Sequence, residues 1–207
     1  HHCRMPSHPD PLVALTRKPD RAGDREVLDS VLDEARVGTL STVVDRLPWS
    51  VPMLFARDGD DILLHGSSGA GLLRHIAAGA PVAFTVFVLD GIVIADTLFN
   101  HSANYRSAVV RGTCVKVDDS RHVLEMMSDK MIPGRVAEVP AATAKEIAAT
   151  ITLRLPIVDG QWLAKARTGG PGVDVDGWTG VVPVRTVFDE PIGYSDGEVP
   201  ESVRRLV

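Results

Sequence analysis

The sequence predicts a mainly β domain, organised as a β-barrel with small helices at its ends. Strand-like segments joined by tight turns come first, at residues 38–44, 49–57 and 61–65. A near-continuous apolar strand over 81–89 follows one short helix, and further strands come later in the chain. Helices of modest length between these strands are suited to covering the ends of a barrel.

Length and composition favour one soluble domain. The chain has 207 residues, of which 44% are hydrophobic and 24% are charged, as is ordinary for a globular protein that buries a core. A formal net charge of -5 argues against nucleic acid or a membrane surface as a partner.

The sequence shows no signal for membrane insertion, secretion, a disulfide framework or a cysteine-based metal site. No apolar run approaches the roughly 18 residues that span a bilayer, and no secretory pattern opens the chain. Cys3 and Cys114 offer neither a disulfide framework nor the ligand spacing of a metal site. We therefore expect a cytoplasmic protein without a metal site.

The chain divides into a proline- and charge-rich irregular arm, residues 1–22, and a single domain over 23–207. Asp24 is placed to cap a helix over 25–36, in which apolar residues recur at helical spacing. Turn signals and apolar periodicity predict the other elements: turns at 45–48 and 58–60, helices over 72–78, 118–130 and 141–149, and strands over 151–158, 161–167 and 178–184.

Polar side chains are densest in the segment 90–107. Asp90-Gly91 predicts a tight turn, and a short strand over 92–94 follows it. Polar residues then crowd positions 100–107, ahead of another strand over 108–117. So many hydrogen-bonding groups cannot be buried without partners, so we expect them to face a polar ligand.

The segment from His65 to Gly71 is a first candidate binding site. It places glycines and serines between a strand and a helix, where a backbone can approach a phosphate and helix N–H groups can bind it. An ordinary glycine- and serine-rich loop with a helix cap explains the same pattern. The segment is not a Walker A loop, because no Gly-Lys-Ser/Thr follows.

Two further candidate sites carry cations. Arg106 and Ser107 can bind a phosphate or carboxylate, and nearby His101 is an acid, a base, a metal or haem ligand, or a structural histidine. Lys165 and Arg167 alternate along a strand, so both side chains point the same way, toward one anion or toward solvent. The motifs of the common hydrolases are missing from the sequence.

Longer segments carry a family resemblance. HGSSG with LLRHIAAGAPVAFTV, then LDGIVIADTLFNHSANYRSAVVRG, and KARTGGP with WTGVVPV resemble the pyridoxamine 5'-phosphate oxidase-related, FMN-binding split-barrel family, in the branch of nitroimidazole-resistance-type reductases. The similar region runs from about Arg25 to Val184. The resemblance implies a six-stranded split β-barrel and a homodimer with FMN bound at the subunit interface.

Carried over by position, the resemblance implies an FMN-dependent oxidoreductase that reduces a small organic substrate by hydride transfer from flavin N5. His101 or Tyr105 would donate a proton to the product. The residues implied in cofactor binding are Val51, Pro52, Met53, His65, Gly66, Ser67, Ser68, Arg106, Ser107, Lys165, Arg167 and Trp178.

The chain departs from the family pattern at two places. Ala70-Gly71 stands where relatives often carry Ser-Arg, and Asp96 stands where they often carry an arginine. The loss of cations near a phosphate keeps two alternatives open. One is a split-barrel enzyme that binds haem, with His65 or His101 as ligand, or a deazaflavin. The other is a non-catalytic, dimeric ligand-binding protein with a degenerate flavin site.

Overall fold

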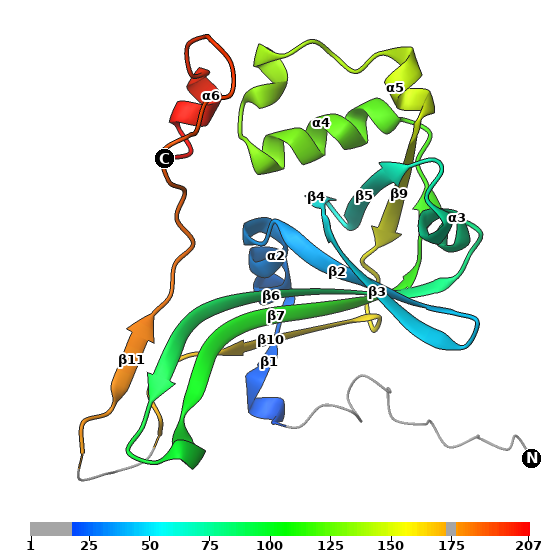
Figure 1. Cartoon of the computed structure of the whole chain (residues 1–207). Helices are drawn as coiled ribbons and strands as arrows, with labels where there is room; N and C mark the ends of the chain where they lie inside the picture. The colour runs from blue at the N-terminus through cyan, green and yellow to red at the C-terminus, as the bar shows by residue number, and fades with distance from the viewer. Residues whose placement is uncertain (1–17, 173–176) are drawn as a thin grey trace, which may run out of the picture.

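The computed structural model describes residues 18–172 and 177–207, so most of the predicted arm lies outside the described residues. Two antiparallel sheets and their flanking helices form the molecule (Figure 1), which confirms the mainly β prediction. The seven-stranded sheet, the large sheet, has the order β1-β10-β7-β6-β2-β3, with β11 paired to β6. The four-stranded sheet, the small sheet, has the order β4-β5-β9-β8.

The large sheet contains β1 (Ala22–Gly23), β2 (Val37–Val44), β3 (Leu47–Leu54), β6 (Pro81–Ile94), β7 (Ser102–Thr113), β10 (Trp162–Arg167) and β11 (Gly180–Pro183). The small sheet contains β4 (Ala56–Asp58), β5 (Asp61–Ser67), β8 (Val115–Lys116) and β9 (Thr150–Pro156). The helices are α2 (Arg25–Glu34), α3 (Gly71–Ala77), α4 (Ser120–Met131), α5 (Ala144–Ala148) and α6 (Glu201–Arg204), with 3-10 turns η1 (Pro19–Arg21), η2 (Leu98–Asn100) and η3 (Arg135–Glu138).

Local signals explain the first helix and the first hairpin. The Asp24 carboxylate accepts a hydrogen bond from Val27 N at 3.1 Å, which confirms the predicted cap of α2. Asp45 and Arg46 join β2 to β3 with φ of 50° and 64°. Positive φ at both central residues matches the right-handed twist of the paired strands.

The core lies between α2 and the two sheets. Leu28 and Leu32 of α2 are fully buried, as are Phe55 and Phe84, whose rings meet edge to face at 5.0 Å between centroids. Gly38 in β2 allows this packing, because a Cβ there would lie 2.2 Å from Cζ of Phe84.

The prediction of a turn at Asp90-Gly91 is wrong. Strand β6 runs through it from Pro81 to Ile94, with only a bulge between Leu89 and Gly91. The glycine is needed for close packing, since a Cβ on Gly91 would lie 2.9 Å from Cγ1 of Val181 in β11. The start predicted for the next strand, at 108, is also wrong, because the polar segment Ser102–Ser107 already belongs to β7.

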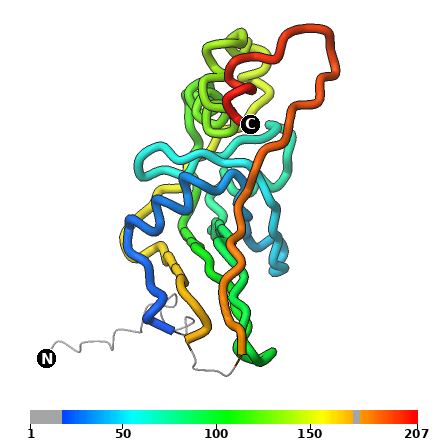
Figure 2. Tube along the Cα trace, turned by 90° about the vertical axis from the view of Figure 1, so that its left-hand side faces the viewer, coloured from blue at the N-terminus to red at the C-terminus, as the bar shows by residue number. Residues whose placement is uncertain are grey.

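After β11, residues 184–200 form an extended C-terminal strap that leads to α6 (Figure 2). The strap is held at its far end, where the Glu138 carboxylate accepts hydrogen bonds from the backbone N and Oγ of Ser202. None of the helices among the described residues is long and apolar enough to cross a membrane.

Lys130 of α4 joins that helix to α2. Its Nζ donates to the Leu32 carbonyl at 2.6 Å, in the last turn of α2, and lies 3.5 Å from the Phe55 ring centroid. Burial of the ammonium lowers the pKa of Lys130 to about 8.

Replacing Gly38 tests the packing against Phe84. Gly38→Ala is expected to lower the free energy of unfolding by about 1–3 kcal/mol, because the new methyl group forces apart a rigid, buried contact. Gly71→Ala is the control, since a Cβ there meets no atom within 4 Å. Urea unfolding would measure both, and an unchanged midpoint for Gly38→Ala would contradict the contact.

Lys130 predicts a pH dependence of stability. Its pKa of about 8 lies below the ordinary value of 10.5, so between these values the unfolded chain holds a proton that the folded chain has lost. The contribution of Lys130 to stability therefore rises with pH across that window, by less than about 1.4 kcal/mol per pH unit, the limit for one proton. Lys130→Met is expected to remove this rise, as measured by urea unfolding at pH 8 and 10. Parallel pH profiles for the two proteins would contradict it.

Candidate functional site

The residues predicted to bind the cofactor lie in three separate places. His65, Gly66 and Ser67 end β5 in the small sheet, and Ser68 follows directly after this strand. Val51, Pro52 and Met53 lie on β3, at one edge of the large sheet. The rest of the set lies on β7, on β10 and ahead of β11: Arg106, Ser107, Lys165, Arg167 and Trp178. The individual roles given to these residues stay predictions.

The loop between β5 and α3 uses its own hydrogen-bond donors. Ser68 N donates to Ala149 O at 2.9 Å, and Ala70 N donates to Ser67 O at 2.9 Å. Gly69 N donates to Ser67 Oγ at 3.2 Å. A phosphate placed here would therefore compete with existing bonds, and neither Ala70 nor Gly71 supplies a cation.

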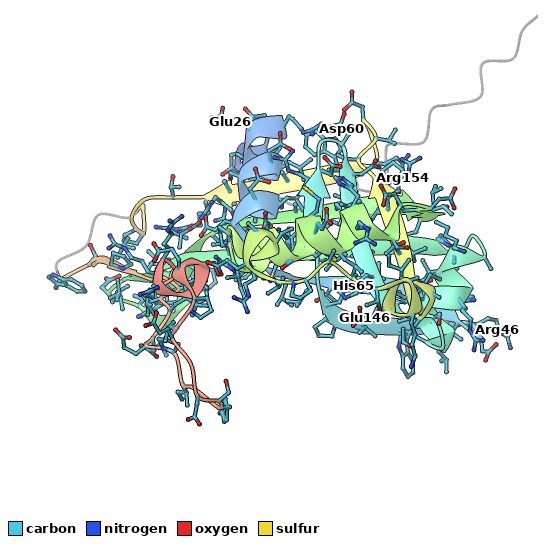
Figure 3. All side chains as sticks on the ribbon, turned by 90° about the horizontal axis from the view of Figure 1, so that it is seen from above. Glu26, Arg46, Asp60, His65, Glu146 and Arg154 are labelled. Atoms are coloured by element: carbon cyan, nitrogen blue, oxygen red, sulfur yellow. The ribbon has the colours of Figure 1, made fainter. Side chains whose placement is uncertain are left out.

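His65 lies half-buried on the face of β5 that packs against α4. Its Nδ1 is 2.9 Å from Sδ of Met127, and its Nε2 has no hydrogen-bond partner among the described residues. Burial lowers the pKa of His65 below its ordinary value, so the ring is neutral near pH 7. Figure 3 shows His65 and Glu146 at the same end of the molecule, where β5 pairs with β9.

The pairing of β7 with β10 shows on which face of the large sheet each predicted cation lies. Ser107 is opposite Lys165 and Tyr105 is opposite Arg167, so these side chains share one face of the large sheet. The register therefore confirms that Lys165 and Arg167 point the same way. Arg106 points to the other face, so it cannot bind the same group as Ser107 from one side.

Arg106 is already bound by carboxylates. Its Nε and Nη2 donate to the two Asp90 oxygens at 3.0 and 2.6 Å, and Nη2 lies 2.7 Å from Glu34 Oε2. The hydrogen bonds to Asp90 raise the pKa of Arg106 further above its ordinary value. These bonds join α2, β6 and β7 at one point.

Arg167 is occupied in a similar way. Its Nη1 donates to Asn104 Oδ1 at 2.6 Å, and its Nη2 donates to Gly170 O at 3.1 Å. Asn104 in turn donates from Nδ2 to Gly169 O at 3.1 Å. Arg167 and Asn104 therefore fix the start of the loop that follows β10.

The two candidate proton donors lie in different surroundings. His101 is exposed at the tip of the β6–β7 hairpin, with Nδ1 2.6 Å from Thr97 O, beside Leu98 and Phe99, which are 92% and 95% exposed. Tyr105 stacks on Phe87 at 5.8 Å between ring centroids. Trp178 is exposed and packs on Gly180, where a Cβ would lie 2.9 Å from its ring.

A cavity near these residues was not predicted from the sequence. It has a volume of about 740 Å³ and lies between the end of α2, the bulged part of β6 and the start of the C-terminal strap. We call it the α2–β6 cavity; its lining residues come from 34–37, 87–90 and 183–186. These segments are far apart in sequence, and no local pattern links them.

A smaller apolar pocket of about 280 Å³ lies beside the predicted phosphate loop. It is lined by Val44, Trp49, Gly71, Leu72 and His75. Within the described residues, no cluster of three or more His, Cys, Asp or Glu side chains is arranged to hold a metal ion.

Comparison with known proteins identifies the family. The model of the pyridoxamine 5'-phosphate oxidase family matches residues 24–161. The chain therefore belongs to this split-barrel family, as the resemblance predicted. No curated protein matches it.

Solved structures agree with this assignment. The FAD and heme binding protein from Mycobacterium smegmatis is 40% identical, with a TM-score of 0.85 over 90% of this chain and 97% of that one. The flavocytochrome Anf3 from Azotobacter vinelandii is 29% identical, with a TM-score of 0.82 over 93% and 95%. A putative 5-nitroimidazole antibiotic resistance protein from Bacteroides thetaiotaomicron shares the fold, at 20% identity and a TM-score of 0.59 over 69% and 83%.

The bonds of Arg106 predict a loss of stability on its removal. Arg106→Ala is expected to lower the free energy of unfolding by about 1.5–3 kcal/mol, because it leaves the Asp90 carboxylate without its charged partner. Glu34→Gln is the milder control, at less than about 1 kcal/mol, since Glu34 is more exposed than Asp90.

A double-mutant cycle separates this interaction from other effects. In an Asp90→Asn background, Arg106→Ala is expected to cost at least about 1 kcal/mol less, as chemical unfolding would measure. Equal costs in both backgrounds would show that the pair adds nothing to stability.

Proposed function

We propose that this chain is a flavin-dependent oxidoreductase that also holds a haem group. The observation that carries the proposal is the 40% identity, across nearly the whole of both chains, to a protein that binds FAD and haem. The similarity to a flavocytochrome supports the same pair of cofactors. The relatives' names favour FAD over the FMN expected from the sequence, so we propose FAD as the flavin.

His65 is our proposed haem ligand. A haem iron binds a neutral imidazole, and burial keeps His65 in that form. With Nδ1 directed at Met127, the free Nε2 is the nitrogen left for iron. The contact of Nδ1 and the neutral form of the ring support His65 as the ligand.

The other described histidines suit this role less well. His75 Nε2 lies 3.0 Å from Val43 O, and His122 Nε2 lies 2.8 Å from Asp58 Oδ2. His101, the alternative ligand from the sequence, is exposed at a hairpin tip.

We propose that the flavin lies between two copies of the chain, beside Val51–Met53. Exposed apolar side chains on the β2–β3 hairpin of the large sheet, including Val43, Leu47 and Leu54, support a homodimer because a second copy would cover them. The outer edge of β3 has no paired strand among the described residues, so its backbone groups are also open to a ligand or a partner.

When bound, a flavin accepts and gives hydride and a haem carries single electrons, so the pair links two-electron donors to one-electron steps. The protein would bind both groups and a small organic substrate. Tyr105, whose ring is fixed by stacking on Phe87, is our candidate to donate a proton to the reduced product. His101 is the second candidate.

An absorption spectrum of the purified full-length protein tests the proposal. We expect a Soret band together with flavin absorption, and FAD rather than FMN in an acid extract. His65→Ala is expected to lose the Soret band and keep the flavin. The matched variants His101→Ala and His75→Ala are expected to keep both.

Other outcomes identify the alternatives. A Soret band that survives His65→Ala and is lost in His101→Ala would move the ligand to the hairpin tip. FMN in the extract would restore the original flavin prediction. A colourless protein that ignores added haem, FAD, FMN and a deazaflavin would favour a non-catalytic ligand-binding protein.

A further inference from the structure

The α2–β6 cavity has the size and walls of a small-molecule site. Its volume of about 740 Å³ lies within the roughly 300–1,000 Å³ that is usual for such sites. Apolar side chains of Val37, Val88 and Pro183 line it. Phe87 adds a ring that is 55% exposed, which offers a flat surface to an aromatic ligand.

A gap in the large sheet supplies backbone groups to the cavity. Strand β6 pairs with β2 at Val82–Thr85 and with β11 at Gly91–Ile94. Between these partners, the one backbone bond described on that edge runs from Val184 N to Asp90 O, at 3.0 Å. Residues 87–89 line the cavity, so their outward N–H and C=O groups can meet polar atoms of a ligand.

Two arginines at the cavity have no carboxylate partner among the described residues. They are Arg36, at the end of α2, and Arg185, in the C-terminal strap. Nε of Arg36 is buried without a hydrogen-bond partner, and its guanidinium lies 4.7 Å from the Phe188 ring centroid. An arginine held by stacking, with unused donors, is suited to bind a carboxylate or phosphate.

The other charges of the wall select between these anions. Glu34 and Asp90 line the cavity, and both bind Arg106. Arg106, Arg36 and Arg185 carry three positive charges, and the two carboxylates carry two negative charges. One net positive charge therefore remains around the cavity. Such a balance favours a single negative charge over a phosphate dianion, which the two carboxylates would repel.

We propose that the α2–β6 cavity is a binding site for an aromatic monocarboxylate, held by Arg36 and Arg185 with its ring against Phe87. The site uses none of the residues assigned to bind haem or flavin, and it shares with the proposed reaction only Phe87, whose ring also stacks on Tyr105. It therefore does not depend on the proposed cofactors.

Calorimetric titration of the full-length protein with 2-naphthoate tests the site. We expect saturable binding, and at least tenfold weaker binding of the neutral analogue 2-naphthamide and of inorganic phosphate. Arg36→Gln and Arg185→Gln are each expected to weaken 2-naphthoate binding at least tenfold. Arg46→Gln, on the β2–β3 turn (Figure 3), is the matched control and is expected to bind as the unchanged protein does.

Three results would overturn the proposal: no saturable binding of 2-naphthoate at millimolar concentration, equal binding of the amide, or unchanged binding by both arginine variants. Arg36 contributes to packing, so circular dichroism would check that its variant is folded. Arg185 is exposed, and its variant decides the question if Arg36→Gln does not fold.

Discussion

The hydrogen bonds of Arg106 hold α2, β6 and β7 together, and the walls of the α2–β6 cavity depend on this junction. One guanidinium binds Asp90 of β6 and Glu34 of α2 from its position on β7. Charge-assisted bonds of this kind are shorter and stronger than neutral ones. They fix the end of α2 against the bulged part of β6, and the α2–β6 cavity opens between these same segments. Arg106, which was predicted from the sequence to bind an anionic ligand, therefore stabilises the wall of a different site, the α2–β6 cavity.

Elements with a local cause could be predicted from the sequence. The Asp24 cap and the turn at Asp45 and Arg46 depend on neighbours within four residues, so their signals are visible in the chain. Gly91 shows the limit of this reasoning. Its glycine serves close packing against Val181, ninety residues later, and a turn signal and a packing requirement look the same in the sequence.

The candidate site was likewise predictable only where its features depend on residues close together in the sequence. Alternation along β10 correctly placed Lys165 and Arg167 on one face, because it needs only the strand period. The same period separates Arg106 from Ser107, but the prediction treated them as one clamp. The partners of Arg106 and the walls of the cavity come from distant segments, so only the folded chain reveals them.

The pairing of β1 with β10 has a consequence for the order of assembly. Ala22 pairs with Lys165 and Gly23 with Ala164, whereas β6 and β7 pair across a short connection. During synthesis, β6 and β7 can meet as soon as both have left the ribosome. The short strand β1 can pair only after most of the chain has been made. Its pairing closes a long loop, and only two residue pairs offset the entropy lost in closing it. The edge of the large sheet formed by the start of the described chain therefore cannot be completed until β10 has been made, and β11 is the one strand of this sheet that comes later in the described chain.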